Sequence, residues 1–330
     1  MLGDAIAQVQ AAAAQGPAVE GVGCAHPRLR TLADRLHRMP QHAPPPTIDR
    51  IVLGTVQLGL RYGRRSGAEA MPEADAFRIL DRAWDVGIRR FDTAEAYGCA
   101  AERLASWLAA SGRAGEAEII TKVPVPSAGD RDAVHRACRR FPGAVRLAVL
   151  THGAPSRPTF DRFALLALEC DAVPGVSAYS AAEIVELGGS AARRVQAPMN
   201  VIDGRQLLAA RAAGIPFDGR SVYLQGVLLD PHDVAEGRVP GAGRLAEAVA
   251  ACARDAGLEP AVALLAGALA SLGPDDRVVV GVDSPEEVDA IVEAAAAPAV
   301  RVEAFRSAIA DAVSVTDAIT RMLDPRTWKR

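Results

Sequence analysis

Short apolar runs alternate with segments of helical spacing from residue 50 onward. The expected strands cover residues 51–58, 89–93, 118–123, 145–151, 173–179, 195–201, 215–224 and 277–282. Helical spacing of apolar residues follows each strand, as in the helix expected over 73–86, which Gly87 ends. The strands are continuous apolar runs, which is typical of parallel strands covered on both faces. The pattern therefore predicts an α/β fold built from eight strand–helix repeats.

Strand–helix repetition over about 250 residues is typical of a (β/α)8 TIM barrel. A doubly wound sheet gives a similar pattern, so the chemistry must decide between the two. The segment Asp233–Pro240 is expected to be loop. The stretch that follows it, 241–246, fits a G-x-G-x-x-A dinucleotide fingerprint, but no strand precedes it. We interpret it as a loop that enters a helix.

Residues 1–48 differ from the rest of the chain. They contain an Ala-rich stretch, a leucine stripe over 28–39 and three consecutive prolines at 44–46, which favour a stiff, extended linker. We interpret 1–48 as an N-terminal extension with a Pro-rich linker, and 49–330 as the barrel domain.

Charge and composition favour a cytoplasmic protein that acts on small molecules. The net charge is −3 and no long basic run occurs, so the sequence does not indicate binding to nucleic acid or to a membrane surface. The longest apolar stretch, 261–272, is too short to span a bilayer, and the N-terminus lacks the basic residues of a signal peptide. The five cysteines are scattered and form no CxxC, and no metal site is expected.

Ionisable residues end three consecutive strands. Asp92, Lys122 and His152 lie thirty residues apart, one strand–helix unit per step, and Tyr97 follows Asp92 in the next loop. Because successive strand ends of a barrel surround one face, this period places a carboxylate, an ammonium and an imidazole around one mouth.

These four residues suit carbonyl chemistry. An ammonium near Tyr97 is expected to lower its pKa, which would make the phenol a usable general acid. Asp92 would hold Lys122 charged, and His152 would orient a substrate oxygen by a hydrogen bond. The alternative is a structural ion pair with a strand-end histidine and a packed tyrosine.

The sequence resembles the aldo-keto reductase family, in particular bacterial members with LGTVQ and RSVFLQG-like blocks. The matching stretches are LGTVQLG at 53–59, GIRRFDTAEAYG at 87–98, IITK at 119–122, LAVLTHG at 147–153, GVSAYS at 175–180, VQAPMNVID at 195–203, RSVYLQG at 220–226 and VVVGVDSPEEV at 278–288. The resemblance implies a TIM-barrel, nicotinamide-dependent oxidoreductase in which Asp92, Tyr97, Lys122 and His152 act in catalysis.

The same resemblance implies a set of cofactor-binding residues. These are Ser177, Gln196, Arg220, Ser221, Leu224, Gly226, Gly281 and Ser284. Ala178 stands where the family usually has an Asn, and Arg220 where an aromatic often stacks on the nicotinamide, a role that a guanidinium can also fill.

The choice between NAD(H) and NADP(H) depends on the segment 281–287. It holds three carboxylates and no Lys or Arg, whereas family members that prefer NADP have a cation there. This favours NAD(H) slightly, although Arg244 or Arg277 could reach a 2′-phosphate instead.

The residues leave the substrate open. We expect a carbonyl or alcohol of a small metabolite, such as a sugar derivative or a biosynthetic intermediate. One alternative is a lyase or epimerase that uses the same Tyr/Lys/His set on the same fold, and a second is a non-catalytic binding module.

Overall fold

The described chain forms a closed barrel of eight parallel strands in sequential order. The computed structural model describes residues 48–60, 62, 71–187 and 190–313, so the interpretation of 1–48 lies outside it except for Ile48. The strands are β1 (Ile51–Gly54), β2 (Arg90–Asp92), β3 (Glu118–Pro124), β4 (Arg146–His152), β5 (Val173–Ser177), β6 (Arg194–Pro198), β7 (Phe217–Arg220) and β8 (Arg277–Gly281). Closure between β1 and β8 confirms the TIM barrel and excludes the doubly wound sheet.

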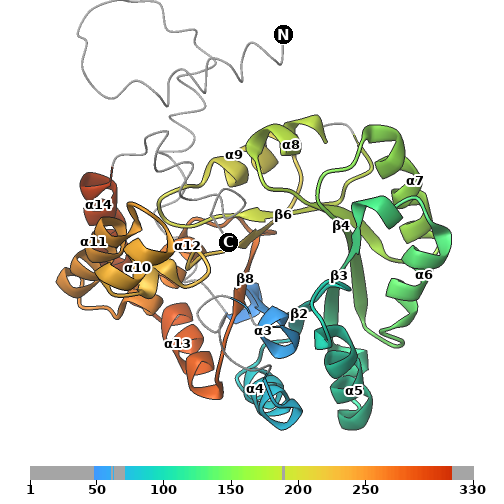
Figure 1. Ribbon diagram of the computed structural model, residues 1–330, viewed down its shortest axis with the longest axis horizontal. Coiled ribbons are helices and arrows are strands. Elements are labelled where there is room, and N and C mark those ends of the chain that lie inside the picture. The colour runs from blue at the N-terminus through green and yellow to red at the C-terminus, as the bar shows by residue number, and fades with distance from the viewer. Residues whose placement is uncertain (1–47, 61, 63–70, 188–189, 314–330) are drawn as a thin grey trace, which may run out of the picture. The chain divides into compact units, whose positions relative to one another are not determined.

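Helices surround the barrel and cover its outer face (Figure 1). They are α3 (Val56–Gly59), α4 (Glu73–Asp85), α5 (Ala100–Ser111), α6 (Arg131–Arg139), α7 (Arg157–Leu168), α8 (Ala181–Glu186), α9 (Arg205–Ala213), α10 (His232–Arg238), α11 (Ala242–Asp255), α12 (Pro260–Ala270), α13 (Pro285–Ala295) and α14 (Ala299–Ala312). Each helix of this part of the chain is too short or too polar to span a bilayer.

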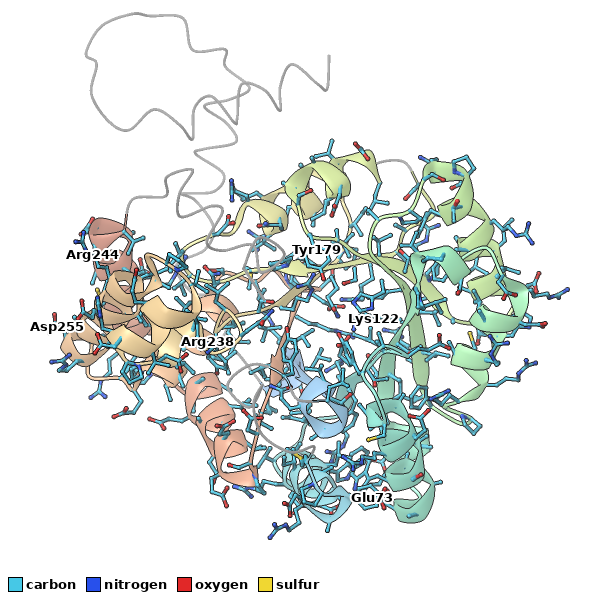
Figure 2. All side chains as sticks on the ribbon, viewed as in Figure 1. Glu73, Lys122, Tyr179, Arg238, Arg244 and Asp255 are labelled. Atoms are coloured by element: carbon cyan, nitrogen blue, oxygen red, sulfur yellow. The ribbon has the colours of Figure 1, made fainter. Side chains whose placement is uncertain are left out.

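Two apolar layers explain why the strands read as continuous apolar runs. Outward-facing strand residues pack under the helices in the main core, as Leu53, Phe91 and Val149 do. A small inner layer fills the barrel and contains Val52, Ile120, Ala148, Leu150 and Val279. Lys122 and Tyr179 lie toward the barrel's centre, whereas Glu73 and Asp255 lie on outer helices (Figure 2). Because the inner apolar layer fills the middle of the barrel, the polar side chains of the interior lie at its two ends.

Three segments differ most from the sequence prediction. The first strand ends at Gly54 instead of Leu58, because the chain turns into α3 after Thr55, whose hydroxyl donates to Asp92 O at 2.9 Å. The seventh strand is also shorter than predicted, since β7 covers Phe217–Arg220 instead of 215–224. The loop expected over Asp233–Pro240 is mostly the helix α10; only Ala235 of this helix is buried, so it carries almost no apolar periodicity.

Two further features lie in the last third of the chain. Helix α14 was not predicted, although Val302, Phe305 and Ile309 give it a buried face of helical spacing. The fingerprint-like stretch at 241–246 begins α11, and Gly241 precedes this helix with φ of 88°. It follows α10 and not a strand, which confirms that it is no Rossmann turn.

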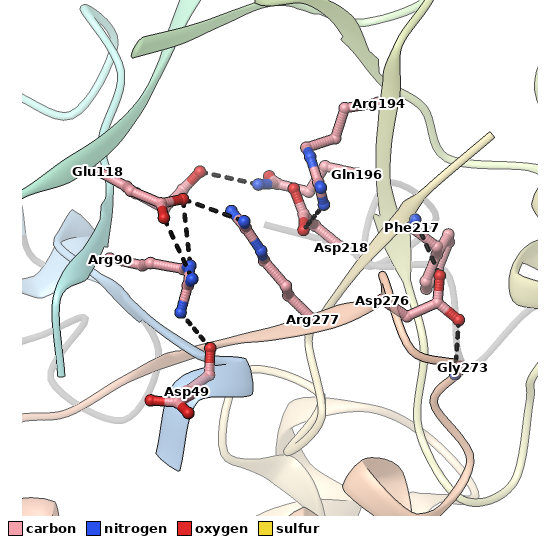
Figure 3. Close-up of polar contacts among 11 residues, drawn as sticks. Asp49, Arg90, Glu118, Arg194, Gln196, Phe217, Asp218, Gly273, Asp276 and Arg277 are labelled. Atoms are coloured by element: carbon pink, nitrogen blue, oxygen red, sulfur yellow. Dashed lines mark hydrogen bonds and ion pairs between the residues drawn. The ribbon is translucent and has the colours of Figure 1, made fainter. Parts of the chain in front are cut away.

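Asp276 fixes the turn into the last strand (Figure 3). Its carboxylate accepts hydrogen bonds from Phe217 N at 3.1 Å and Gly273 N at 2.8 Å, and both contacts are buried.

We predict that Asp276→Ala lowers the free energy of unfolding by about 1–3 kcal/mol for each buried N–H that loses its partner. Urea unfolding measures the effect. The neighbouring exposed Asp275→Ala is the control, and equal stability of the two variants would contradict this role.

Candidate active site

The carboxyl ends of the strands place the four expected catalytic residues at one mouth. Asp92 and His152 are the last residues of β2 and β4, and Lys122 lies two residues before the end of β3. The register pairs Asp92 with Ile120 and His152 with Pro124, so these three residues follow one another around the barrel. Tyr97 joins them from the loop after β2.

A buried ion pair forms the base of the mouth. Lys122 and Asp92 are 1% and 2% exposed, and Lys122 Nζ lies 2.6 and 2.5 Å from the two carboxylate oxygens of Asp92. Lys122 Nζ also donates to Thr93 O at 3.2 Å, and Gln196 Nε2 donates to Asp92 Oδ2 at 2.7 Å. All three ammonium protons therefore have acceptors, and the orientation of both side chains is fixed.

Tyr97 lies directly beside this pair. Its ring centroid is 5.0 Å from Lys122 Nζ, and its ring meets the His152 ring edge to face at 6.1 Å between centroids. The loop reaches this position because Gly59 has no side chain: a Cβ there would overlap Tyr97 O and Ala100 N. Gly98, with φ of 58°, allows the turn that follows.

Burial keeps Tyr97 protonated in this structure. It raises the pKa of the Tyr97 phenol, and the Asp92 carboxylate raises it further, while Arg220 opposes both. This corrects the expectation that the neighbouring ammonium lowers the pKa. The reason is that burial disfavours the charged phenolate and that Asp92, which is paired with Lys122, adds a negative charge beside the ring.

His152 is held neutral. Burial lowers its pKa from the ordinary value of 6.5 to about 4, and the positive charges of Lys122 and Arg220 act in the same direction. A neutral imidazole carries one N–H and one lone pair, so His152 can donate a hydrogen bond to a substrate oxygen without adding a charge.

The residues expected to hold a cofactor form an arc from β5 to β8 on the same rim. Ser177 pairs in register with Gln196, and Arg220 ends β7. Gln196 Oε1 is buried and has no hydrogen-bond partner in the described part of the chain. Such an orphaned acceptor fits the carboxamide N–H of a nicotinamide.

A strained loop continues this arc. Three non-glycine residues after β7 have positive φ, namely Ser221 at 63°, Leu224 at 50° and Gln225 at 55°, followed by Gly226 at 86°. Such strain persists where surrounding structure enforces it, often at ligand sites. Arg238 helps to enforce it, because it donates to Gln225 O at 2.9 Å.

The loop after β8 carries the remaining expected cofactor residues. Gly281 ends the strand, and its backbone lies against the Gln57 side chain, which a Cβ at Gly281 would overlap. Ser284 precedes the first turn of α13, and its side chain caps no N–H there. The structure thus brings both predicted phosphate-binding loops to the same side of the mouth as Gln196 and Arg220.

Sequence reasoning missed three side chains of the mouth. Tyr62 and Tyr179 are close enough to Arg220 for electrostatic coupling, and the Arg220 guanidinium lies 4.5 Å from the centroid of the Tyr179 ring. Gln57, from α3, has a buried Oε1 without a partner among the described residues. The chain has only four tyrosines, and their position after strands β1, β2, β5 and β7 was an available signal.

The departures at Ala178 and Arg220 are linked. Arg220 donates to Ala178 O at 3.0 Å and to Ser221 Oγ at 3.4 Å. Both of these hydrogen bonds go to uncharged oxygens, and no three potential metal ligands gather in the described part of the chain. Arg220 therefore adds a second positive charge beside Lys122.

Residues 50–141 match the model of the aldo/keto reductase family. This segment contains Asp92, Tyr97 and Lys122, while His152 lies beyond it. The match confirms the resemblance to this family and the enzyme class that it implies, a NAD(P)H-dependent oxidoreductase. No curated protein matches the chain significantly.

Solved aldo-keto reductases share the fold. A glycerol dehydrogenase from Gluconobacter oxydans is 19% identical with a TM-score of 0.62, over 84% of this chain and 96% of that one. An aldose reductase from Giardia lamblia is 16% identical with a TM-score of 0.59, over 80% and 92%. An aldo/keto reductase from Brucella melitensis is 17% identical with a TM-score of 0.56, over 78% and 93%.

The pKa of His152 predicts a pH dependence of stability. Between pH 6.5 and about 4 the unfolded chain binds a proton at His152 that the folded chain does not, so stability falls as the pH is lowered. The slope from this residue is at most about 1.4 kcal/mol per pH unit. Urea unfolding at pH 7 and 5 should show a smaller loss for His152→Asn than for the unchanged protein; parallel losses would contradict the neutral imidazole.

Proposed function

We propose that the chain reduces a carbonyl of a small metabolite, or oxidises the corresponding alcohol, with a nicotinamide cofactor and with Tyr97 as the general acid. One observation carries this proposal: Tyr97 and His152 lie edge to face above the buried Asp92–Lys122 pair, at the mouth of the barrel. A bound nicotinamide would supply or accept the hydride, which is chemistry that the protein groups do not perform.

The protein groups supply orientation and a proton. His152 donates a hydrogen bond to the substrate carbonyl oxygen and holds it near the Tyr97 hydroxyl. As a hydride adds to the carbonyl carbon, the carbon–oxygen double bond becomes a single bond and negative charge develops on the oxygen. Tyr97 then transfers its proton to that oxygen, and the positive charge of Arg220 stabilises the phenolate that remains, against the opposing effects of burial and Asp92. Oxidation of the alcohol runs the same steps in reverse.

The arc from β5 to β8 supports the cofactor assignment. Gln196 Oε1 and Ser177 would bind the carboxamide, and Arg220 would stack on the nicotinamide with the face that Tyr179 leaves open. The strained loop that contains Ser221, Leu224 and Gly226, together with Gly281 and Ser284, would lie against the pyrophosphate.

The substrate class and the location are also proposals. The similar structures named glycerol dehydrogenase and aldose reductase favour a polyhydroxylated substrate, such as a sugar derivative. The four described cysteines are free thiols, which favours a cytoplasmic enzyme.

A fluorescence titration with nicotinamide nucleotides tests the proposal against its alternatives. Saturable quenching supports the oxidoreductase, whereas an absence of binding favours a lyase, an epimerase or a binding module. Turnover with a panel of aldoses, ketoses and their alcohols then identifies the substrate.

Tyr97→Phe removes the proposed acidic proton and keeps the ring. We predict a loss of turnover on the order of 10²–10⁴-fold, the usual contribution of a general acid, with unchanged cofactor affinity. Tyr62→Phe is the matched control, because Tyr62, like Tyr97, is a half-buried phenol of the mouth whose pKa is raised by burial. Its turnover should fall much less. If Tyr97→Phe keeps full turnover, or if Tyr62→Phe is the more damaged variant, the proton donor is misassigned.

We predict that NADH binds more tightly than NADPH. Asp283, Glu286 and Glu287 border the start of α13, and a hydrogen bond from Ser284 keeps the pKa of Glu286 low and its charge negative. Repulsion of a 2′-phosphate follows. Arg277 begins β8 at the other end of the barrel, and Arg244 lies on the exposed side of α11 (Figure 2).

Dissociation constants of the four nicotinamide nucleotides check this preference. Glu286→Lys should improve NADPH binding more than NADH binding, because it replaces a repulsive charge by an attractive one. Tighter binding of NADPH by the unchanged protein would refute the interpretation of this loop.

A further inference from the structure

The amino ends of the strands form a second polar layer, at the floor of the barrel. Arg90, Glu118, Arg146, Arg194 and Arg277 are each the first residue of a strand. The register aligns them: Arg90 pairs with Glu118, and Glu118 pairs with Arg146. This layer lies across the inner apolar layer from the mouth, and the proposed reaction uses none of its residues.

Two carboxylates are shared among the arginines of this floor (Figure 3). Glu118 accepts two hydrogen bonds of 3.1 Å from Arg90 and forms an ion pair of 3.0 Å with Arg277. Asp218, fully buried in β7, accepts from Arg194 at 2.6 Å. Three inner guanidinium groups are thus neutralised only in part by two carboxylates.

Two more arginines are exposed to solvent, and one of them, Arg146, interacts with Glu118 only at longer range. Arg146 and Arg193 line a cavity of about 200 Å³ together with Glu118, Arg194 and Arg277. In the described ranges neither Arg146 nor Arg193 has a carboxylate within ion-pair distance. The floor therefore holds five guanidinium groups and two carboxylates; one of the three surplus positive charges is inside the barrel, and the other two are on the exposed side chains at the cavity.

Burial and neighbouring positive charges disfavour the charged form of Arg277. The pKa of Arg277 is lowered, first by burial and then by the positive charges of Arg194 and Arg90. Asp218 Oδ2 is also buried without a hydrogen-bond partner among the described residues. The inner arginines exceed the inner carboxylates by one positive charge, and uncompensated buried charge destabilises a fold, so an anion in the cavity would be stabilised there.

We propose that this floor cavity is a binding site for a phosphate group, carried by inorganic phosphate or by a small phosphomonoester. Guanidinium groups bind phosphate oxygens in bidentate geometry, and a dianion neutralises most of the surplus charge. The volume corresponds to about six or seven water molecules at about 30 Å³ each, which suits a phosphate with a short substituent. Arg146 and Arg193 at the rim contact the phosphate first, and Arg194 and Arg277 face it from inside.

Thermal unfolding in inorganic phosphate tests the site, with sodium chloride at matched ionic strength as reference. We expect a saturable rise of Tm with phosphate for the full chain and for Arg220→Gln, which alters the mouth. Arg254→Gln, an exposed arginine of α11, should behave in the same way. Arg146→Gln/Arg193→Gln should bind phosphate at least tenfold more weakly, which titration calorimetry measures. Glycerol phosphate in a parallel titration distinguishes the two sources: tighter binding than inorganic phosphate identifies a phosphomonoester, and weaker binding identifies the free ion.

A readout without phosphate separates a ligand site from a structural one. In phosphate-free buffer Arg146→Gln/Arg193→Gln should unfold at a Tm equal to or above that of the unchanged protein, because two repelling charges are gone. A lower Tm would show that these arginines stabilise the fold directly, and would overturn the proposal. An equal phosphate response of the double variant, or an equal response to chloride, would overturn it as well.

Discussion

The buried ion pair between Lys122 and Asp92 is the constraint on which the mouth of the barrel depends. Two charges at 1–2% exposure are tolerated only because every ammonium proton and both carboxylate oxygens have partners. That requirement fixes the relative positions of β2, β3 and β6, which contribute Asp92, Lys122 and Gln196. Removing either charge would leave the other buried and unpaired, so fold and chemistry rest on the same contact.

The barrel interior has three layers: charged side chains at the mouth, apolar side chains in the middle and charged side chains at the floor. The inner layer around Val52, Ile120 and Leu150 separates the mouth from the arginine floor. The two ends differ in how charge is arranged: at the mouth the acceptors of Lys122 are complete, while at the floor two carboxylates serve five arginines. The closed barrel therefore has two electrostatically distinct ends.

Sequence reasoning predicted the barrel and the positions of Asp92, Lys122 and His152, because strand length and strand-end polarity are local signals that the closed topology converts into a ring. It missed α10 since this helix buries little, and it overran β1 because Val56 and Leu58 are apolar in either state. The floor was hidden for a different reason. An arginine at the start of a strand is usually interpreted as solvent-exposed, and only the strand register shows that several of these arginines lie close together. The pKa of Tyr97 likewise depends on burial, which spacing does not encode.

The balance of charge at the mouth explains why protonation states divide as they do. At His152, burial acts together with the positive charges of Lys122 and Arg220 and disfavours a further cation, whereas at Tyr97 burial acts together with the negative charge of Asp92 and disfavours the phenolate. His152 responds by remaining neutral, with its pKa near 4, while burial keeps the Tyr97 phenol protonated. Both neutral groups can then donate hydrogen bonds to one oxygen. Negative charge that develops on that oxygen would meet hydrogen-bond donors that are in place before the reaction starts, so little reorganisation of the site is required.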